Sequence, residues 1–127
     1  MSAINSYRDL RVWQSAMDIA ERAYALTSEF PNSEIYGMTS QIRRASVSIA
    51  ANIAEGYGRD STGSFVNFLR IAQGSLKELE THFLLCGRVG LAKEGEIESL
   101  LRQCDELGKM LRAHIRSIQR SRTAEIS

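Results

Sequence analysis

The stretch from Ile35 to Arg59 constrains the fold more than any other part of the chain. At about 100° per residue, its apolar residues form one helical stripe. The members of this stripe are Met38, Ile42, Ala45, Ile49 and Ile53. The opposite face is also small or apolar in large part, and Arg43 and Arg44 are the only charges between Glu34 and Glu55. A helix without a charged face is usually buried on both sides.

The second face of this helix predicts an interface between copies of the chain. It carries Val47, Ala51 and Ala54, together with Arg44. A chain of 127 residues forms one domain with one core, so no second domain is at hand to cover this face. We therefore expect a homo-oligomer with these four residues in its interface.

The periodicity of apolar residues predicts four helices in a single domain. They are expected over residues 9–30, 34–57, 61–89 and 94–120, with a frayed tail at 121–127. No strand pattern competes with this assignment. The predicted fold class is all-α, an up-down-up-down antiparallel four-helix bundle.

Local signals predict how the helices begin, end and pack. Asp9 is expected to cap the first helix. Glycine at position 56 or 58 is expected to end the second helix in the left-handed conformation, and Asp60-Ser61-Thr62 to cap the third. Gly74, inside the third helix, costs roughly 1 kcal/mol relative to alanine, which suggests that another backbone passes close by.

The sequence contains no motif that predicts catalysis or metal binding. A di-iron bundle requires Glu-x-x-His on two helices, but a leucine stands three residues before both His82 and His114. Cys86 and Cys104 fall on apolar stripes, as expected for buried free thiols. Neither GxxxxGK nor GxGxxG occurs. We therefore expect no enzymatic activity, no cofactor and no metal.

The predicted last helix has acidic residues in its first half and basic residues in its second. Arg112, Arg116 and Arg120 recur every four residues, and no acid occurs between Leu107 and Ala124. Such a stripe is the electrostatic pattern of nucleic-acid binding. The net charge of +1 leaves a second interpretation open, in which this end of the helix is simply solvated.

The two arginines of the second helix, Arg43 and Arg44, have two interpretations as well. They face phosphate, or they pair with carboxylates of a neighbouring helix or subunit, because buried charges must be paired.

Four segments of the chain resemble one known family. They are YRDLRVWQSA, FPNSEIYGMTSQIRRASVSI, NIAEGYGR and FLRIAQGSLKELET, which lie within residues 7 to 90. They are similar to the bacterial four-helix-bundle proteins related to the ribosomal RNA intervening-sequence proteins, which include accessory variability proteins of diversity-generating retroelements. The resemblance implies a ring-shaped homopentamer and, in the retroelement branch, binding to nucleic acid and to a reverse transcriptase. This chain departs from the family at Ala50-Ala51, where Pro-Ser is common, and at Ser64, where an acid is usual.

The sequence as a whole predicts a non-enzymatic homo-oligomer that acts as an RNA- or DNA-binding accessory protein. Arg112, Arg116 and Arg120, and then Arg43 and Arg44, are the expected phosphate-binding residues. The alternative is a structural or protein-interaction scaffold whose arginines serve subunit contacts only. The expected partners are further copies of the chain, RNA or DNA, and a reverse transcriptase or another protein. No segment is typical of a signal peptide or a membrane span, so no membrane partner is expected and the expected location is the cytoplasm.

Overall fold

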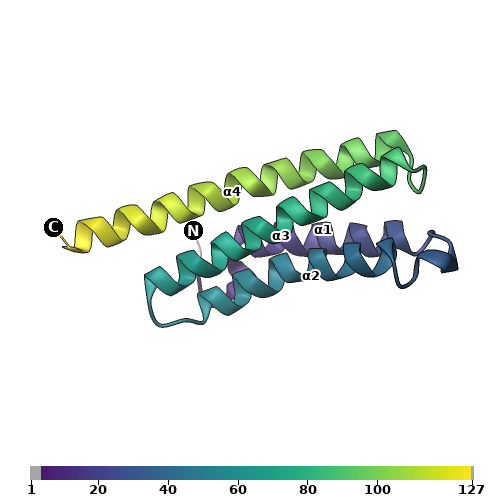
Figure 1. The fold of residues 1–127 in the computed structure, drawn as a ribbon. Helices are drawn as coiled ribbons and strands as arrows, with labels where there is room; N and C mark the ends of the chain where they lie inside the picture. The colour runs from purple at the N-terminus through teal and green to yellow at the C-terminus, as the bar shows by residue number, and fades with distance from the viewer. Residues whose placement is uncertain (1–3, 127) are drawn as a thin grey trace.

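The computed structural model describes residues 4–126 and is all-α. Its elements are two short 3-10 turns and four helices: η1 (Tyr7–Asp9), α1 (Arg11–Thr27), η2 (Asn32–Glu34), α2 (Met38–Tyr57), α3 (Thr62–Arg88) and α4 (Glu94–Ile126). α1 packs against α2 and α4, and α3 packs against the same two helices. The chain thus forms the expected antiparallel four-helix bundle, without a strand in residues 4–126 (Figure 1).

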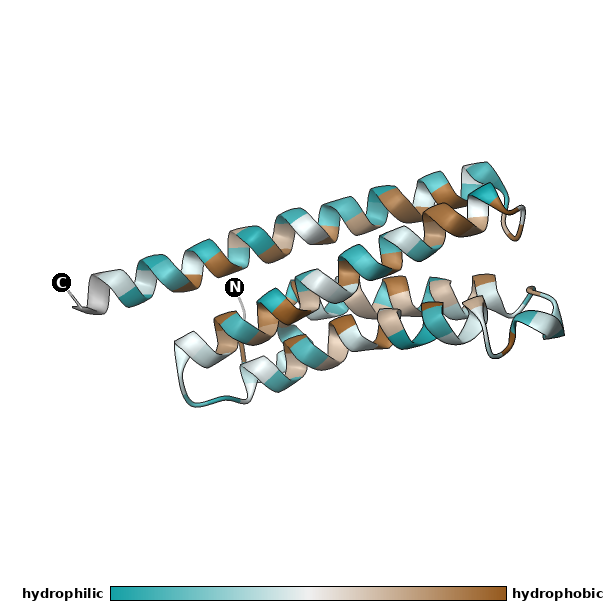
Figure 2. Ribbon diagram, in the orientation of Figure 1, coloured by the Kyte–Doolittle hydropathy of each residue, from teal (hydrophilic) through white to brown (hydrophobic). Residues whose placement is uncertain are grey.

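One hydrophobic core runs along the bundle between the four helices. Hydrophobic and hydrophilic residues alternate along each helix, as expected for helices with one buried side (Figure 2). The largest fully buried side chains are Phe83, Ile19, Ile42, Ile49, Ile53, Leu69, Leu76, Leu79, Leu100, Leu107 and Leu111. Each such side chain contributes roughly 1.5–3 kcal/mol when it leaves water. The core, rather than helix propensity, therefore provides most of the stability.

The start of α3 uses the capping residues that the sequence predicts, and its end uses a left-handed glycine. At its start, the Ser61 hydroxyl accepts a hydrogen bond from the Ser64 N–H at 3.1 Å. At its end, Gly90 adopts φ of 79°, and the Leu91 N–H donates to the Cys86 carbonyl at 2.9 Å. A left-handed glycine with this hydrogen bond ends a helix abruptly. The turn into α4 is therefore short.

The first two helices begin later than the sequence predicts, and near each start an acidic side chain accepts hydrogen bonds from the backbone. The Asp9 carboxylate accepts hydrogen bonds from the Asn5 and Ser6 N–H groups at 2.9 and 3.2 Å. Asp9 thus belongs to η1 and does not cap α1, which begins at Arg11. The Glu34 carboxylate likewise accepts from the Met38 N–H, at 3.1 Å, at the start of α2.

The expected left-handed glycine at the end of α2 is wrong. Gly58 has φ of −77°, and Gly90 is the only described glycine with positive φ. Gly56 serves close packing instead. A Cβ added there would lie 2.6 Å from Cβ of Phe68 and 3.0 Å from Cδ1 of Phe65. The absence of a side chain at Gly56 lets α2 and α3 approach each other.

The expectation that another backbone passes close to Gly74 is also wrong for the described residues of this chain. A Cβ added at this position would meet no described atom within 4 Å, and the residue is exposed on α3. No backbone from another described element passes within 4 Å of it.

α4 is longer than expected and extends past the rest of the bundle. It continues through Ile126 rather than ending at 120, so residues 121–126 are helical; residue 127 lies outside the described part. α4 has 33 residues against 17 in α1, and its C-terminal turns project beyond the other helices (Figure 1). Over the described residues, no helix has the length and apolar composition that crossing a bilayer requires.

Candidate nucleic-acid and oligomer interfaces

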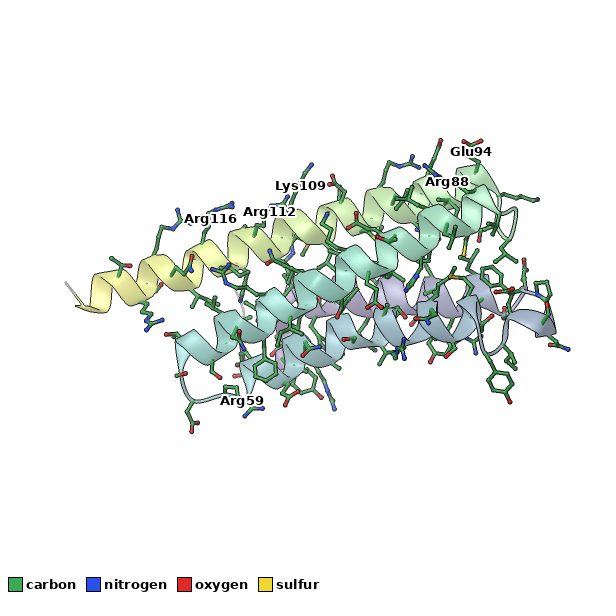
Figure 3. All side chains as sticks on the ribbon, viewed as in Figure 1. Arg59, Arg88, Glu94, Lys109, Arg112 and Arg116 are labelled. Atoms are coloured by element: carbon green, nitrogen blue, oxygen red, sulfur yellow. The ribbon has the colours of Figure 1, made fainter. Side chains whose placement is uncertain are left out.

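The three arginines of the predicted α4 stripe are exposed and carry no ion pair with a described residue. Lys109, Arg112 and Arg116 follow one another along α4 toward its C-terminus (Figure 3). The ion pairs of the described residues involve other bases: Arg59, Lys77, His82 and Lys109. The guanidinium groups of Arg112, Arg116 and Arg120 are therefore available to an external anion, and arginine suits phosphate because its donors form a planar fork.

The acidic half of α4 lies at the opposite end of the bundle. Glu94 and Arg88 mark that end in Figure 3, whereas Arg59 and Arg116 lie toward the other. Acids at the N-terminus and bases at the C-terminus both stabilise the dipole of a helix. The same arrangement keeps the acidic residues of the first half of α4 away from the arginine stripe.

Arg43 is engaged within the bundle. Its Nε donates to the Thr27 hydroxyl at 2.9 Å, and its guanidinium lies over the Tyr24 ring, 4.5 Å from the centroid. The buried Thr27 hydroxyl in turn donates to the Ala23 carbonyl at 2.8 Å. Arg43 thus ties α2 to α1 through a hydrogen bond and a cation–π contact.

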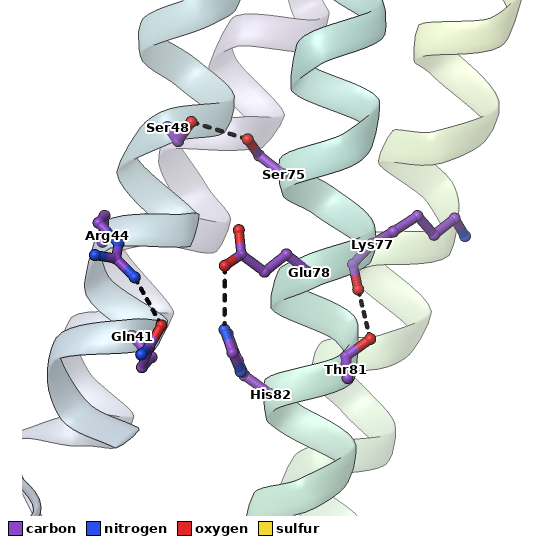
Figure 4. Close-up of polar contacts among 8 residues, drawn as sticks. All are labelled: Gln41, Arg44, Ser48, Ser75, Lys77, Glu78, Thr81 and His82. Atoms are coloured by element: carbon purple, nitrogen blue, oxygen red, sulfur yellow. Dashed lines mark hydrogen bonds and ion pairs between the residues drawn. The ribbon is translucent and has the colours of Figure 1, made fainter. Parts of the chain in front are cut away.

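Arg44, by contrast, is exposed. One of its guanidinium nitrogens donates to Gln41 Oε1 at 2.7 Å (Figure 4). α2 and α4 are diagonal in the bundle, so the structure does not bring Arg43 and Arg44 together with the α4 arginines.

A broad apolar groove, which we call the α1/α2 groove, follows the predicted oligomer face of α2. It has a cavity volume of about 500 Å³. Its lining residues are Tyr7, Trp13, Met17, Ala20, Glu21, Tyr24, Val47, Ala50, Ala51 and Ala54. Val47 is 46% exposed. The structure thus gathers Val47, Ala51 and Ala54 on one surface, and Arg44 is exposed on the same helix.

The α1 half of this groove was missed by reasoning from the sequence. Met17 and Tyr24 are 42% and 45% exposed, and Trp13 packs edge-on against Tyr7 with ring centroids 5.4 Å apart. A signal was present, since Trp13, Met17, Ala20 and Tyr24 follow one another at spacings of four, three and four. They form a second stripe beside the core stripe of α1.

Among the described side chains, one neutral hydrogen bond and no ion pair joins α2 to α3 along their seam (Figure 4). The Ser48 and Ser75 hydroxyls are 2.8 Å apart, and Asn52 Nδ2 donates to the Ser48 carbonyl at 2.8 Å. His82 and Glu78 face each other along α3, with Nε2 and Oε1 3.6 Å apart. Every ion pair of the described residues joins two positions three or four residues apart in the sequence, so none of them links α2 to α3.

Neither cysteine has the character of a nucleophile. Burial raises the pKa of the Cys86 thiol to about 11 and that of Cys104 to about 12, with Glu34 and Glu80 adding to the respective shifts. Both thiols therefore stay protonated near neutral pH. Among the described side chains, no three of His, Cys, Asp or Glu cluster closely enough to hold a metal ion. The surfaces described above are suited to binding anions and apolar side chains.

The sequence model of the family described as 23S rRNA-intervening sequence protein matches residues 8–113. The chain belongs to this family. One similar solved structure is the 1.70 Å crystal structure of a protein with unknown function from the S23 ribosomal protein family of Bacteroides thetaiotaomicron VPI-5482. The two are 30% identical and superpose with a TM-score of 0.76 over 82% of this chain and 97% of the other. No curated protein matches this chain significantly.

The match to the 23S rRNA-intervening sequence proteins ends inside α4, at residue 113. Arg112 lies within the matched residues, whereas Arg116 and Arg120 lie beyond them. The full arginine stripe therefore has to be explained from this chain itself, and the family match alone does not account for it.

Proposed function

We propose that this protein is a non-enzymatic, self-associating nucleic-acid-binding accessory protein of the cytoplasm. The observation that carries the proposal is the exposed stripe of Arg112, Arg116 and Arg120, which no described carboxylate neutralises. Steps of four residues advance about 6 Å along a helix. Since a nucleic-acid strand carries one phosphate per about 3.4 Å of duplex axis, three such side chains can reach phosphates of one backbone. The stripe would neutralise backbone charge without reading sequence.

The family description supports RNA as the first probe, because it names 23S rRNA. Duplex DNA has the same phosphate chemistry and is the second probe.

Self-association is supported by two different apolar surfaces on one chain. One is the α1/α2 groove; the other is the outer face of α3, which we define by the exposed residues Ile71, Gly74 and Leu85 and which also carries Glu78 and Thr81. A patch on one copy can cover the other patch on the next copy in a head-to-tail contact. Such contacts close into a ring when the rotation between neighbouring subunits divides a full turn evenly. The resemblance to the family implies a homopentamer, which we propose as the state of assembly.

The test is a titration of the purified protein with structured RNA and duplex DNA across a salt series. Each phosphate contact contributes about −0.9 to the slope of log K against log salt on B-DNA. Replacing Arg112, Arg116 and Arg120 together by alanine should abolish most of the binding and flatten the slope. The matched control replaces Arg88 and Arg102, which are exposed arginines outside the stripe. Absence of binding by the unaltered protein at low salt, or unchanged binding by the triple variant, would reject the function.

A structural or protein-interaction scaffold is the second candidate function. The α1/α2 groove favours it, because contiguous exposed apolar surface marks a site of protein contact. A stable oligomer that binds neither RNA nor DNA would support this alternative and direct the search to protein partners, including a reverse transcriptase.

A further inference from the structure

The antiparallel register of α3 and α4 places a further arginine beside the stripe. A Cβ added at Gly108 of α4 would lie 3.7 Å from Cδ2 of Leu76 on α3. A Cβ added at Gly63, near the start of α3, would lie 3.2 Å from a guanidinium nitrogen of Arg122. Arg70 lies between these two contacts along α3, so it faces the stretch of α4 between Gly108 and Arg122.

Arg70 lies on the side of α3 that borders α4. A Cβ added at Gly63 would meet Arg122 of α4, so the side of α3 that carries Gly63 faces α4. Arg70 follows Gly63 by seven residues and precedes Lys77 by seven, and residues seven apart share a face. Arg70 is exposed and forms no ion pair with a described residue, whereas Lys77 pairs with Glu80 at 3.3 Å.

Arg112 borders the same seam from the side of α4. A guanidinium nitrogen of Arg112 lies 3.5 Å from the position of a Cβ added at Gly108, the glycine that faces Leu76 of α3. Arg116 follows one turn later on α4 and is exposed. Arginines from two helices therefore flank one seam near the basic end of the bundle.

We propose that Arg70 of α3 and Arg112 and Arg116 of α4 form one two-helix basic face, and that its partner is double-stranded nucleic acid held by its phosphates. The inference rests on the proposed function and extends it from one helix to two. Packed helices have axes about 8–10 Å apart, so the face presents two rows of guanidinium groups rather than one. Two rows suit a duplex, which offers two backbones, better than a single strand.

The position of the aromatic residues also favours a duplex. Binding of single strands relies on exposed aromatic side chains that stack on bases. Trp13 and Tyr24 line the α1/α2 groove, which does not include the α3/α4 seam. Phe65, on α3, is occupied by edge contacts with Tyr57 and His114, at centroid distances of 6.0 and 5.6 Å. The two-helix basic face therefore offers charge without a stacking platform.

The experiment compares Arg70→Gln with Arg88→Gln, the matched control. Both positions are exposed arginines of α3, but Arg88 lies at the acidic end beside Glu94 (Figure 3). Binding is measured across a salt series with a duplex of about 30 base pairs and with one of its strands alone. Arg70→Gln should weaken duplex binding several-fold and lower the salt slope by about 1, as expected for one lost phosphate contact. Arg88→Gln should leave both unchanged, and Arg70→Lys should retain most of the slope.

The outcomes separate this inference from the function on which it rests. If Arg70→Gln matches Arg88→Gln while the triple α4 variant loses binding, the two-helix face is overturned and the nucleic-acid function stands. If the isolated strand binds as tightly as the duplex, the assignment of the partner is overturned. If the triple variant binds normally, the proposed function fails and this inference fails with it. Circular dichroism of each variant shows whether the fold is retained.

Discussion

At the scale of single residues, Gly56 is closely packed and Gly74 is open to solvent, although both lie inside helices. The structure therefore predicts opposite effects on stability when each is replaced by alanine. Gly56→Ala places a Cβ 2.6 Å from that of Phe68, so α2 and α3 must separate. Overpacking of this kind costs typically 1–3 kcal/mol, which exceeds the gain in helix propensity. Gly74→Ala meets nothing within 4 Å in the chain and should stabilise by about 0.5–1 kcal/mol.

Urea unfolding of both variants beside the unaltered protein, at one protein concentration, checks this pair of predictions. The fixed concentration matters because self-association shifts apparent stability. A destabilising Gly74→Ala would contradict the prediction for the isolated chain and would point to a second copy against the outer face of α3.

His114 should make stability depend on pH. Burial lowers the pKa of His114 below its usual value of 6.5. The ring packs edge-on against Phe65, and Asp9 and Arg11 line the hollow beside it. The imidazole of His114 therefore binds a proton less tightly in the folded state than in the unfolded state. Its contribution to stability is fully present above pH 6.5 and is lost as the pH falls toward the lower folded-state pKa.

The measurement is the free energy of unfolding at about pH 7.5 and about pH 5, for the unaltered protein and for His114→Phe. The unaltered protein should lose more stability on acidification than the variant, which has no ring to protonate at this position. Equal losses in the two proteins would remove His114 as the cause.

At the scale of elements, Arg43 is the side chain that links α1 to α2. Arg43→Met keeps the aliphatic stem but removes the hydrogen bond to Thr27 and the contact with the Tyr24 ring. We expect a loss of about 1–2 kcal/mol, the sum of one hydrogen bond and one partly buried cation–π contact. Arg44→Met, one position along and exposed, should change stability by less than about 0.5 kcal/mol.

Thermal or urea unfolding compares the stability of the Arg43→Met and Arg44→Met variants directly. Nucleic-acid titration of the same variants tests the other interpretation of these arginines, which is phosphate binding. Since Arg43 is already engaged, its loss should weaken binding far less than loss of the α4 stripe. A variant at position 43 that keeps full stability but loses binding would instead favour the phosphate-binding interpretation of that arginine.

At the scale of the whole molecule, the α1/α2 groove predicts how the assembly is disrupted. Val47→Glu or Ala51→Glu places a charge on the wall of the groove and should dissociate the oligomer while helicity is retained. Ser40→Glu is the matched control, because Ser40 is exposed on the same helix but does not line the groove. Light scattering gives the mass and circular dichroism gives the helicity. A mass near 14.2 kDa for the unaltered protein at micromolar concentration would contradict self-association altogether.

The periodic features of this molecule could be predicted from the sequence, because they depend on neighbours a few residues apart. The apolar stripes predict the four helices, and the segments that resemble the intervening-sequence family agree with the family match over residues 8–113. The spacing of Arg112, Arg116 and Arg120 predicts a single exposed stripe for the same reason. Helix starts were predicted less well, since Asp9 and Glu34 bond to backbone groups that helical periodicity does not reveal.

What faces each residue across the bundle was decided only by the tertiary structure. The sequence alone placed Gly56 at the end of the second helix and Gly74 inside the third, but Phe68 opposes Gly56 and no described atom lies within 4 Å of a Cβ added at Gly74. Likewise, Arg43 and Arg70 are both helical arginines, yet packing turns the first toward Tyr24 and leaves the second exposed beside α4. The physical reason is that periodicity along one helix defines its faces, whereas the identity and register of the neighbouring helix depend on how all four apolar stripes pack into one core.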